Sequence, residues 1–193
     1  NRIRGAKEAM RAYGADTVIL DDGFQQWKIG KDLEIVTIDS TGAFGNRHLI
    51  PRGILREPLS SLGRAGIFVL TKTNLGPDTA ELKGFLRSVN TGAAIFESMH
   101  WPLGFYELGN PDKLRDPKEM VNKSLILFSG IADPDSFERL VCGLGFDIKR
   151  HFRFPDHHNY SQGDLDKIVR AAREANVTTL ATTEKDSSRL DAI

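Results

Sequence analysis

Short runs of hydrophobic residues alternate along the chain with longer segments in which hydrophobic residues recur with helical spacing. Runs of the first kind are typical of strands buried in a parallel sheet, and segments of the second kind are typical of amphipathic helices. The runs predict strands at Thr17–Leu20, Leu33–Ile38, Ile67–Thr71, Ala94–Glu97, Leu125–Ser129, Ile148–Phe152 and Thr178–Ala181. Because strands and helices alternate, we expect an α/β fold with a mostly parallel sheet layered with helices.

Polar residues at the ends of the helical segments support the helix prediction. Helices are predicted at Asn1–Tyr13, Thr79–Val89, Asp133–Leu144 and from Ser161 to about Ala175. In the third of these, Asp133 can cap the helix and Pro134 suits the first turn. In the fourth, Ser161 and Asp164 have the spacing of a capping box.

Residues 98–123 interrupt the alternation of strands and helices. They contain Pro102, Pro111 and Pro117 together with several charged residues, as in an irregular connection. We therefore place a boundary between two α/β lobes near residue 110. Residues 1–110 form the first lobe and residues 111–193 form a second, smaller lobe.

Acidic residues follow the first predicted strand directly. Asp21 and Asp22 come after the Thr17–Leu20 run, and Gln25 lies a few residues beyond them. Ligands bind at this end of the strands in open α/β sheets, and adjacent carboxylates there commonly bind Mg²⁺. The pattern indicates a phosphate-handling enzyme. The alternative is an acidic turn in which Gly23 supplies the bend.

A second candidate segment covers residues 45–58 and is rich in basic residues, glycine and proline. Arg52 and Arg56 could contact phosphate oxygens, because a guanidinium group can donate two parallel hydrogen bonds. Glu57 could join a metal site as a further carboxylate. The alternative is a loop that leads into a helix and contains an ordinary Arg–Glu pair.

A third candidate segment is the connection from the Ile148–Phe152 strand to the following helix. Its sequence includes Asp156, His157 and His158. A histidine can move a proton near neutral pH, and a neighbouring carboxylate can fix its tautomer. Adjacent histidines point in different directions, so we expect only one of them to act. The alternative is a turn with Asp156 as its cap and with two solvated histidines.

The last candidate segment follows the Thr178–Ala181 strand. Lys185 could neutralise a phosphate group, and Thr182 or Thr183 could donate a hydrogen bond to it. The alternative is a helix start that Thr183 caps, with Asp186 at the third helical position.

Composition narrows the class of protein. The chain has 26 basic and 26 acidic residues, so its formal net charge is zero and no basic excess indicates nucleic-acid binding. A single cysteine, Cys142, excludes an internal disulfide, and its place in a helical stripe predicts that it is part of the core. The sequence contains no Gly-x-x-x-x-Gly-Lys-[Ser/Thr] motif, so these residues encode no P-loop.

Taken together, the candidate segments resemble the tetraacyldisaccharide 4′-kinase family, the lipid A pathway kinases of Gram-negative envelopes. The matching blocks are Asp21-Asp22-Gly23-Phe24-Gln25, Leu49-Ile50-Pro51-x-Gly53-x-Leu55-Arg56-Glu57, Ser129-Gly130-Ile131-Ala132 with Pro134 and Phe137, Phe154-x-Asp156-His157-His158, and Thr183-Glu184-Lys185-Asp186. They occur in the family's order and cover nearly the whole chain. Gln26 stands where the family usually has His, and Arg52 and Ile54 replace the more usual Ala and Pro.

The resemblance implies transfer of the γ-phosphate of ATP to the 4′-hydroxyl of tetraacyldisaccharide 1-phosphate, with Mg²⁺. It implies a P-loop-kinase-like fold and peripheral contact with the cytoplasmic face of the bacterial inner membrane. The family's P-loop, the acidic partner of its histidine and its amphipathic membrane segment are expected upstream of Asn1. This chain is therefore expected to carry the Walker-B-like Asp pair and the second lobe, and to be inactive alone.

The same resemblance assigns roles to individual residues. The implied set is Asp21, Asp22, Gln25 and Glu57 for the metal, Arg2, Arg56 and Gln25 for the substrate, Thr183 and Lys185 for ATP, and Asp22, Asp156 and His157 for catalysis. Two other classes of protein stay open from the residues themselves. One is a metal-dependent phosphoesterase of the Asp-His-His type, and the other is a non-catalytic α/β interaction module.

Overall fold

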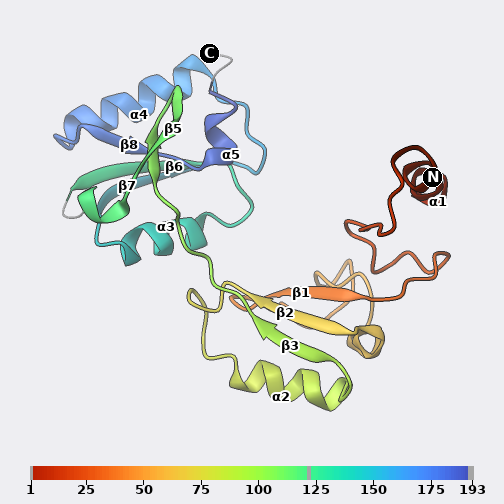
Figure 1. Ribbon diagram of the computed structural model, residues 1–193. Helices are drawn as coiled ribbons and strands as arrows, with labels where there is room; N and C mark the ends of the chain where they lie inside the picture. The colour runs from red at the N-terminus through yellow and green to blue at the C-terminus, as the bar shows by residue number, and fades with distance from the viewer. Residues whose placement is uncertain (1, 121–122, 191–193) are drawn as a thin grey trace. The chain divides into compact units, whose positions relative to one another are not determined.

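The computed structural model describes residues 2–120 and 123–190 (Figure 1). The chain forms two compact units, divided between Met99 and His100. Each unit contains a parallel sheet with helices packed against it, so the expected α/β class is confirmed.

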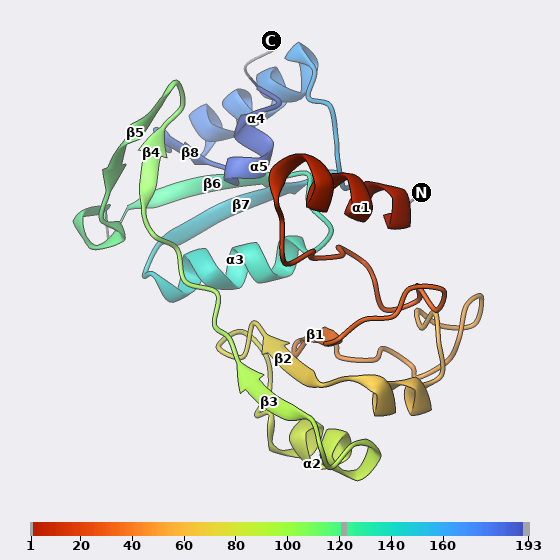
Figure 2. The same ribbon diagram turned by 45° about the vertical axis from the view of Figure 1, so that its right-hand side comes forward.

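The first unit contains a helix followed by a small α/β layer. Its elements are α1 (Arg2–Tyr13), β1 (Ile35–Asp39), the short 3-10 helix η1 (Leu59–Arg64), β2 (Ile67–Thr71), α2 (Ala80–Val89) and β3 (Ala94–Glu97). The strands are parallel and lie in the order β1-β2-β3. Successive side chains of a strand point to opposite faces, so Phe68 and Leu70 of the central strand reach the same face, where Leu86 of α2 covers them. Figure 2 shows α2 along that face of the sheet.

The predicted strand at Thr17–Leu20 is wrong. These residues form no strand, and Ile19 is 91% exposed. A β-favouring run becomes a strand only where a neighbouring strand completes its hydrogen bonds, and no strand in the described part of the chain pairs with this one. Asp21 and Asp22 lie in a turn instead, so the acidic-turn alternative describes the local backbone correctly.

The second unit begins with a hairpin and continues as a layered α/β structure. Its elements are β4 (Phe105–Glu107), β5 (Asn110–Arg115), the 3-10 helix η2 (Pro117–Met120), β6 (Ser124–Ser129), α3 (Pro134–Gly143), β7 (Asp147–Arg153), α4 (Gln162–Glu174), β8 (Thr179–Ala181) and α5 (Glu184–Ser187). The parallel sheet has the order β7-β6-β8. The aromatic rings of Phe105 and Phe146 lie 5.3 Å apart, which fastens the hairpin to this unit. The hairpin therefore belongs to the second unit. The units divide between Met99 and His100, whereas the sequence predicts a boundary further along the chain, near residue 110.

The central strand β6 is buried on both faces, as its hydrophobic sequence predicts. Leu125 and Leu127 belong to the core cluster that includes Val141 of α3. Ile126 and Phe128 belong to the cluster on the opposite face, which α4 covers. Figures 1 and 2 show α3 and α4 on opposite sides of this sheet. The carboxyl end of β6 is thus held rigidly between two helix layers.

Both predicted helix caps are present in the second unit. The Asp133 carboxylate accepts a hydrogen bond from the Ser136 backbone N–H at 3.0 Å, and Pro134 occupies the first turn of α3. Ser161 and Asp164 form the expected capping box at the start of α4. The prediction that Cys142 lies in the core is wrong, because its side chain is on the solvent-facing side of α3.

Candidate functional site

In the first unit, two of the candidate segments line one cavity. The cavity has a volume of about 290 Å³, and its lining includes Asp22, Gln25, Arg56 and Glu57. Asp22 and Gln25 come from the turn region that follows α1, and Arg56 and Glu57 come from the loop that precedes η1. Residues more than thirty positions apart in the sequence, such as Asp22 and Arg56, therefore meet at this cavity.

Asp22 and Arg56 form an ion pair at this cavity. The Arg56 Nη1 lies 2.7 Å from Asp22 Oδ2 and 3.0 Å from Asp22 Oδ1. Asp22 has a φ of 49°, in the left-handed region that non-glycine residues rarely adopt outside functional or tightly constrained sites. Both side chains are more than half exposed. The pair is consequently open to exchange with a ligand, because exposed ion pairs contribute little to stability.

Glu57 is held more firmly than Asp22. Its carboxylate accepts a hydrogen bond from Arg64 Nη2 at 2.8 Å and another from the indole Nε1 of Trp27 at 3.1 Å. Burial is the largest single influence and acts to raise the pKa of Glu57. The hydrogen bonds from Arg64 and Ser61 outweigh it, so the pKa is lowered overall. Glu57 is therefore ionised at neutral pH.

Sequence reasoning did not single out Arg64 or Trp27. The Arg64 guanidinium lies 3.8 Å from the centre of the Trp27 ring and 4.2 Å from that of Phe24. This stacking fixes the wall of the cavity beside Glu57. The sequence carries only a weak signal for this contact. Trp27 lies close to the Asp pair, but Arg64 is far from it in sequence and reaches it only through the position of η1.

Two further predicted site residues lie outside the lining of this cavity. The Arg2 Nη2 donates a long hydrogen bond of 3.4 Å to the backbone carbonyl of Asp21. Neither Arg2 nor Asp21 lines the cavity that contains Asp22 and Glu57. Their roles in substrate and metal binding stay predictions.

The donor atoms at the cavity match Mg²⁺ in chemical type. The carboxylates of Asp22 and Glu57 and the amide oxygen of Gln25 are the hard oxygen ligands that Mg²⁺ takes. Within residues 2–120 and 123–190, however, no group of three or more His, Cys, Asp or Glu side chains is arranged to hold a metal ion. Because Arg56 and Arg64 occupy the two carboxylates, Mg²⁺ would have to displace Arg56 from Asp22 to bind there.

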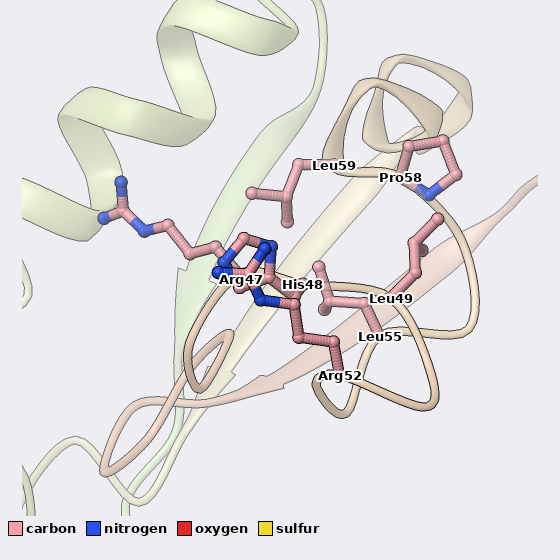
Figure 3. A pocket seen from close by; sticks show the side chains of 7 residues that line it. All are labelled: Arg47, His48, Leu49, Arg52, Leu55, Pro58 and Leu59. Atoms are coloured by element: carbon pink, nitrogen blue, oxygen red, sulfur yellow. The ribbon is translucent and has the colours of Figure 1, made fainter.

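A neighbouring cavity of about 460 Å³ is lined mainly by residues of the 45–58 segment, which we call the basic loop (Figure 3). Leu55, Pro58 and Leu59 line both cavities, so the two are adjacent. Arg52, which the sequence places near phosphate, lines this second cavity and not the one around Asp22. The Arg47 side chain extends away from the cavity in Figure 3, and its guanidinium lies 5.5 Å from the centre of the Phe85 ring.

In the second unit, the loop after β7 separates the two histidines, as expected. The His158 ring stacks on Phe154 with a centroid distance of 4.5 Å, and its Nε2 lies 3.2 Å from Asp164 Oδ2. His158 is therefore a structural residue. The His157 side chain is 72% exposed and stands in a left-handed backbone conformation with a φ of 60°. Of the two side chains, that of His157 is by far the more exposed.

The remaining candidate residues of the second unit form two local contacts, one between Lys185 and Asp156 and one in which Thr183 caps α5. Lys185 Nζ lies 3.1 Å from Asp156 Oδ1, and this hydrogen bond is the main reason that the pKa of Asp156 is lowered. Thr183 caps α5 and accepts a hydrogen bond from the backbone N–H of Asp186, as the capped-helix alternative predicted. Contact of Thr183 or Lys185 with ATP stays a prediction.

The geometry of the Asp156-His157-His158 segment does not favour a metal-dependent phosphoesterase. Such an enzyme needs several carboxylate and imidazole ligands that converge on one ion. His158 instead binds the helix-capping Asp164, and no convergent group of metal ligands exists in the part of the chain that the structure describes.

Comparison with known proteins identifies what this chain resembles. A family model described as tetraacyldisaccharide-1-P 4′-kinase, LpxK, matches residues 1–193. The tetraacyldisaccharide 4′-kinase of Anaeromyxobacter sp. (strain K) is 38% identical over 197 residues, covering 99% of this chain and 50% of that protein. The corresponding protein of Halothermothrix orenii is 36% identical over 197 residues, covering 97% of this chain and 51% of that protein.

A solved structure extends the similarity to three dimensions. The crystal structure of LpxK from Aquifex aeolicus in complex with ATP matches with a TM-score of 0.63 at 28% identity, covering 98% of this chain and 53% of that one. The chain thus spans about half the length of the relatives it matches. Among residues 2–120 and 123–190, no helix has the length and hydrophobicity that crossing a bilayer requires.

Proposed function

The chain belongs to the tetraacyldisaccharide-1-P 4′-kinase family, and from this membership we propose that the protein containing it phosphorylates a lipid A precursor. The reaction is transfer of the γ-phosphate of ATP to the 4′-hydroxyl of tetraacyldisaccharide 1-phosphate. The observation that carries the proposal is the family match over residues 1–193, which includes every candidate segment. A non-catalytic interaction module would not need these segments in the family's order.

Phosphoryl transfer depends mainly on positioning and on neutralising negative charge. The cavity of the first unit offers both kinds of group. Arg56 can bind a phosphate or sugar oxygen once it leaves Asp22, since its guanidinium already donates twice to a pair of oxygens there. Asp22, Gln25 and Glu57 supply oxygen donors for Mg²⁺. The ion would neutralise charge on the phosphates of ATP.

His157 is the candidate group of the second unit for contact with the reacting groups. Its ring is exposed, and its Nε2 lies 3.7 Å from the Asp156 carboxylate, which is longer than a hydrogen bond. A substrate hydroxyl, phosphate oxygen or partner carboxylate can therefore reach Nε2. We assign His157, together with Asp156, to the activation of the attacking hydroxyl.

The acceptor in the proposed reaction is a lipid, so the protein has to meet its substrate at a membrane surface. We infer peripheral contact with the cytoplasmic face of the bacterial inner membrane, where ATP is available. ATP as the phosphate donor is supported by the ATP complex of the related Aquifex aeolicus protein.

Transfer of radioactive phosphate from [γ-³²P]ATP to tetraacyldisaccharide 1-phosphate by the complete protein tests this function. We expect Asp22→Asn and His157→Asn each to lower turnover at least about a hundredfold, the lower end of the effect of a single catalytic group. Asp32→Asn is the matched control, because Asp32 is an exposed carboxylate of the same unit outside both cavities. Near-wild-type turnover in both site variants would refute the assignment.

A further inference from the structure

We propose that Arg189 is a positioning residue that fixes the His157 imidazole as its Nε2–H tautomer, and that the buried carboxylate of Asp186 holds Arg189 in place. The catalytic relevance of this arrangement rests on the role proposed above for His157. The arrangement itself rests on contacts among Asp186, Arg189 and His157, all of which belong to the second unit.

The tautomer follows from the chemistry of arginine. Arg189 Nη2 lies 3.2 Å from His157 Nδ1. A guanidinium group stays protonated in proteins and can only donate hydrogen bonds. His157 Nδ1 must therefore accept with its lone pair, which leaves the ring proton of the neutral imidazole on Nε2.

A fully buried carboxylate anchors the arginine. Asp186 has no exposed surface, and it accepts hydrogen bonds from the Gly130 backbone N–H at 3.1 Å and from the Thr183 hydroxyl at 2.7 Å. Its other oxygen lies 3.2 Å from Arg189 Nη1. The Arg189 side chain is only 18% exposed. The Arg189 guanidinium is thus held in place by the Asp186 carboxylate, which is buried and fixed by its own hydrogen bonds.

One backbone carbonyl oxygen, that of Gly130, accepts hydrogen bonds from both Arg189 and His157. The Gly130 backbone oxygen accepts from Arg189 Nη1 at 3.3 Å and from the His157 backbone N–H at 3.1 Å. This fixes the distance between the arginine and the backbone of the histidine. Gly130 can serve here because it has no side chain: an added Cβ would lie 3.0 Å from the Cβ of His158 and 3.2 Å from Asp186 Oδ1.

This geometry narrows what His157 can do. While Arg189 occupies Nδ1, the ring has an N–H at Nε2 and no free lone pair. It can donate a hydrogen bond to a carboxylate or a phosphate oxygen, but it cannot take the proton of the attacking hydroxyl. Its part in activating the attacking hydroxyl is therefore to orient an acidic group or a phosphate through the Nε2–H hydrogen bond.

A second histidine of the same unit provides an internal reference. His151 Nδ1 lies 2.8 Å from Glu138 Oε2, and its Nε2 lies 2.8 Å from the Ser129 hydroxyl. Glu138 has a lowered pKa and is ionised, so it can only accept, and His151 must carry a proton on Nδ1. The two histidines are thus expected to show opposite tautomers when neutral.

Long-range ¹H–¹⁵N NMR of the ¹⁵N-labelled chain at mildly alkaline pH tests the inference. We expect His157 to show the Nε2–H tautomer alone, with the Nδ1 signal shifted as in a hydrogen-bonded acceptor, and His151 to show a proton on Nδ1. Arg189→Lys keeps a donor and should keep this pattern. Arg189→Met removes the donor and should give His157 the mixed tautomers of a solvated imidazole, with the His151 signals unchanged.

Mixed tautomers or an Nδ1–H signal at His157 in the wild-type chain would overturn the inference, even if Arg189→Met does not fold. An unchanged His157 spectrum in a folded Arg189→Met variant would overturn it as well. These spectra do not depend on phosphate transfer, so they separate failure of this inference from failure of the proposed kinase activity.

Discussion

Removal of the Asp186 carboxylate is the sharpest test of how the second unit is held together. Asp186 is fully buried, and it links the loop after β6 to α5 through Gly130, Thr183 and Arg189. In Asp186→Ala the Gly130 N–H loses its partner, which costs about 1–3 kcal/mol for a buried donor. Breaking the ion pair leaves Arg189 poorly compensated. Removing one partner of a buried pair costs about 3–5 kcal/mol in all, so we expect a loss of roughly that size.

Asp186→Asn should cost less than Asp186→Ala. The amide keeps the volume of the side chain and one acceptor oxygen. At the Oδ2 position that oxygen can still accept from Gly130 and Thr183, but the NH₂ group then replaces the oxygen that faces Arg189. Loss of the negative charge should also lower the pKa of the neighbouring Tyr160 phenol. That pKa is raised mainly by burial and secondly by the charge of Asp186.

Urea unfolding followed by far-UV circular dichroism measures these losses. Asp166→Asn on the exposed face of α4 is the matched control, and it should stay within about 0.5 kcal/mol of the wild-type free energy of unfolding. If Asp186→Ala loses no more than this control, the buried carboxylate does not anchor the unit. If Asp186→Asn is as damaging as Asp186→Ala, volume and the remaining acceptor do not contribute.

Three further predictions follow from single contacts. Gly53→Ala should destabilise the protein by about 1–3 kcal/mol in thermal melts, because the added Cβ would lie 2.2 Å from the backbone oxygen of His48. Gly63→Ala is the control and should be neutral, since a Cβ added there has no heavy atom within 4 Å. Asp164 has a pKa lowered from 3.8 to about 2, first by the Ser161 hydroxyl, so its contribution to stability is present above the unfolded value and is lost as pH falls through the folded value. Urea midpoints measured from pH 5 to pH 2 should therefore fall less in Asp164→Asn than in wild type, and equal slopes would contradict this. The 193-residue chain lacks a P-loop motif, so calorimetric titration should detect no low-micromolar binding of ATP–Mg²⁺.

The sequence predicted those parts of the fold that depend on local interactions. The capping box of Ser161 and Asp164 joins residues three positions apart, and its chemistry can be read directly from their spacing. Strand β6 was predictable because a strand covered on both faces has a continuous hydrophobic sequence. The run Thr17–Leu20 has the same kind of sequence and yet forms no strand. Its conformation depends on partner strands, which its own residues cannot specify.

The candidate site was predictable in its residue types and less so in its contacts. Motif spacing brought attention to Asp22, Arg56 and Glu57, and these line one cavity. Arg64 and Arg189 were missed, because each lies on a different element from the group it contacts and has no distinctive neighbours in the sequence. Such contacts are set by packing of the elements and cannot be read from local spacing.

The two candidate groups share a physical feature that decides how they should be tested. Asp22 and His157 both have positive φ values, 49° and 60°, and each side chain contacts an arginine from a distant part of the chain, Arg56 and Arg189 respectively. A left-handed backbone at a non-glycine residue costs of order 1–3 kcal/mol and persists only where its surroundings fix it. Alanine at either position would retain that cost and remove the contact that offsets it. A loss of activity could then report a displaced backbone. Asparagine tolerates the left-handed region, so Asp22→Asn and His157→Asn remove the charge or the imidazole while the backbone keeps its conformation. Loss of turnover in these variants would therefore be attributable to the missing group itself.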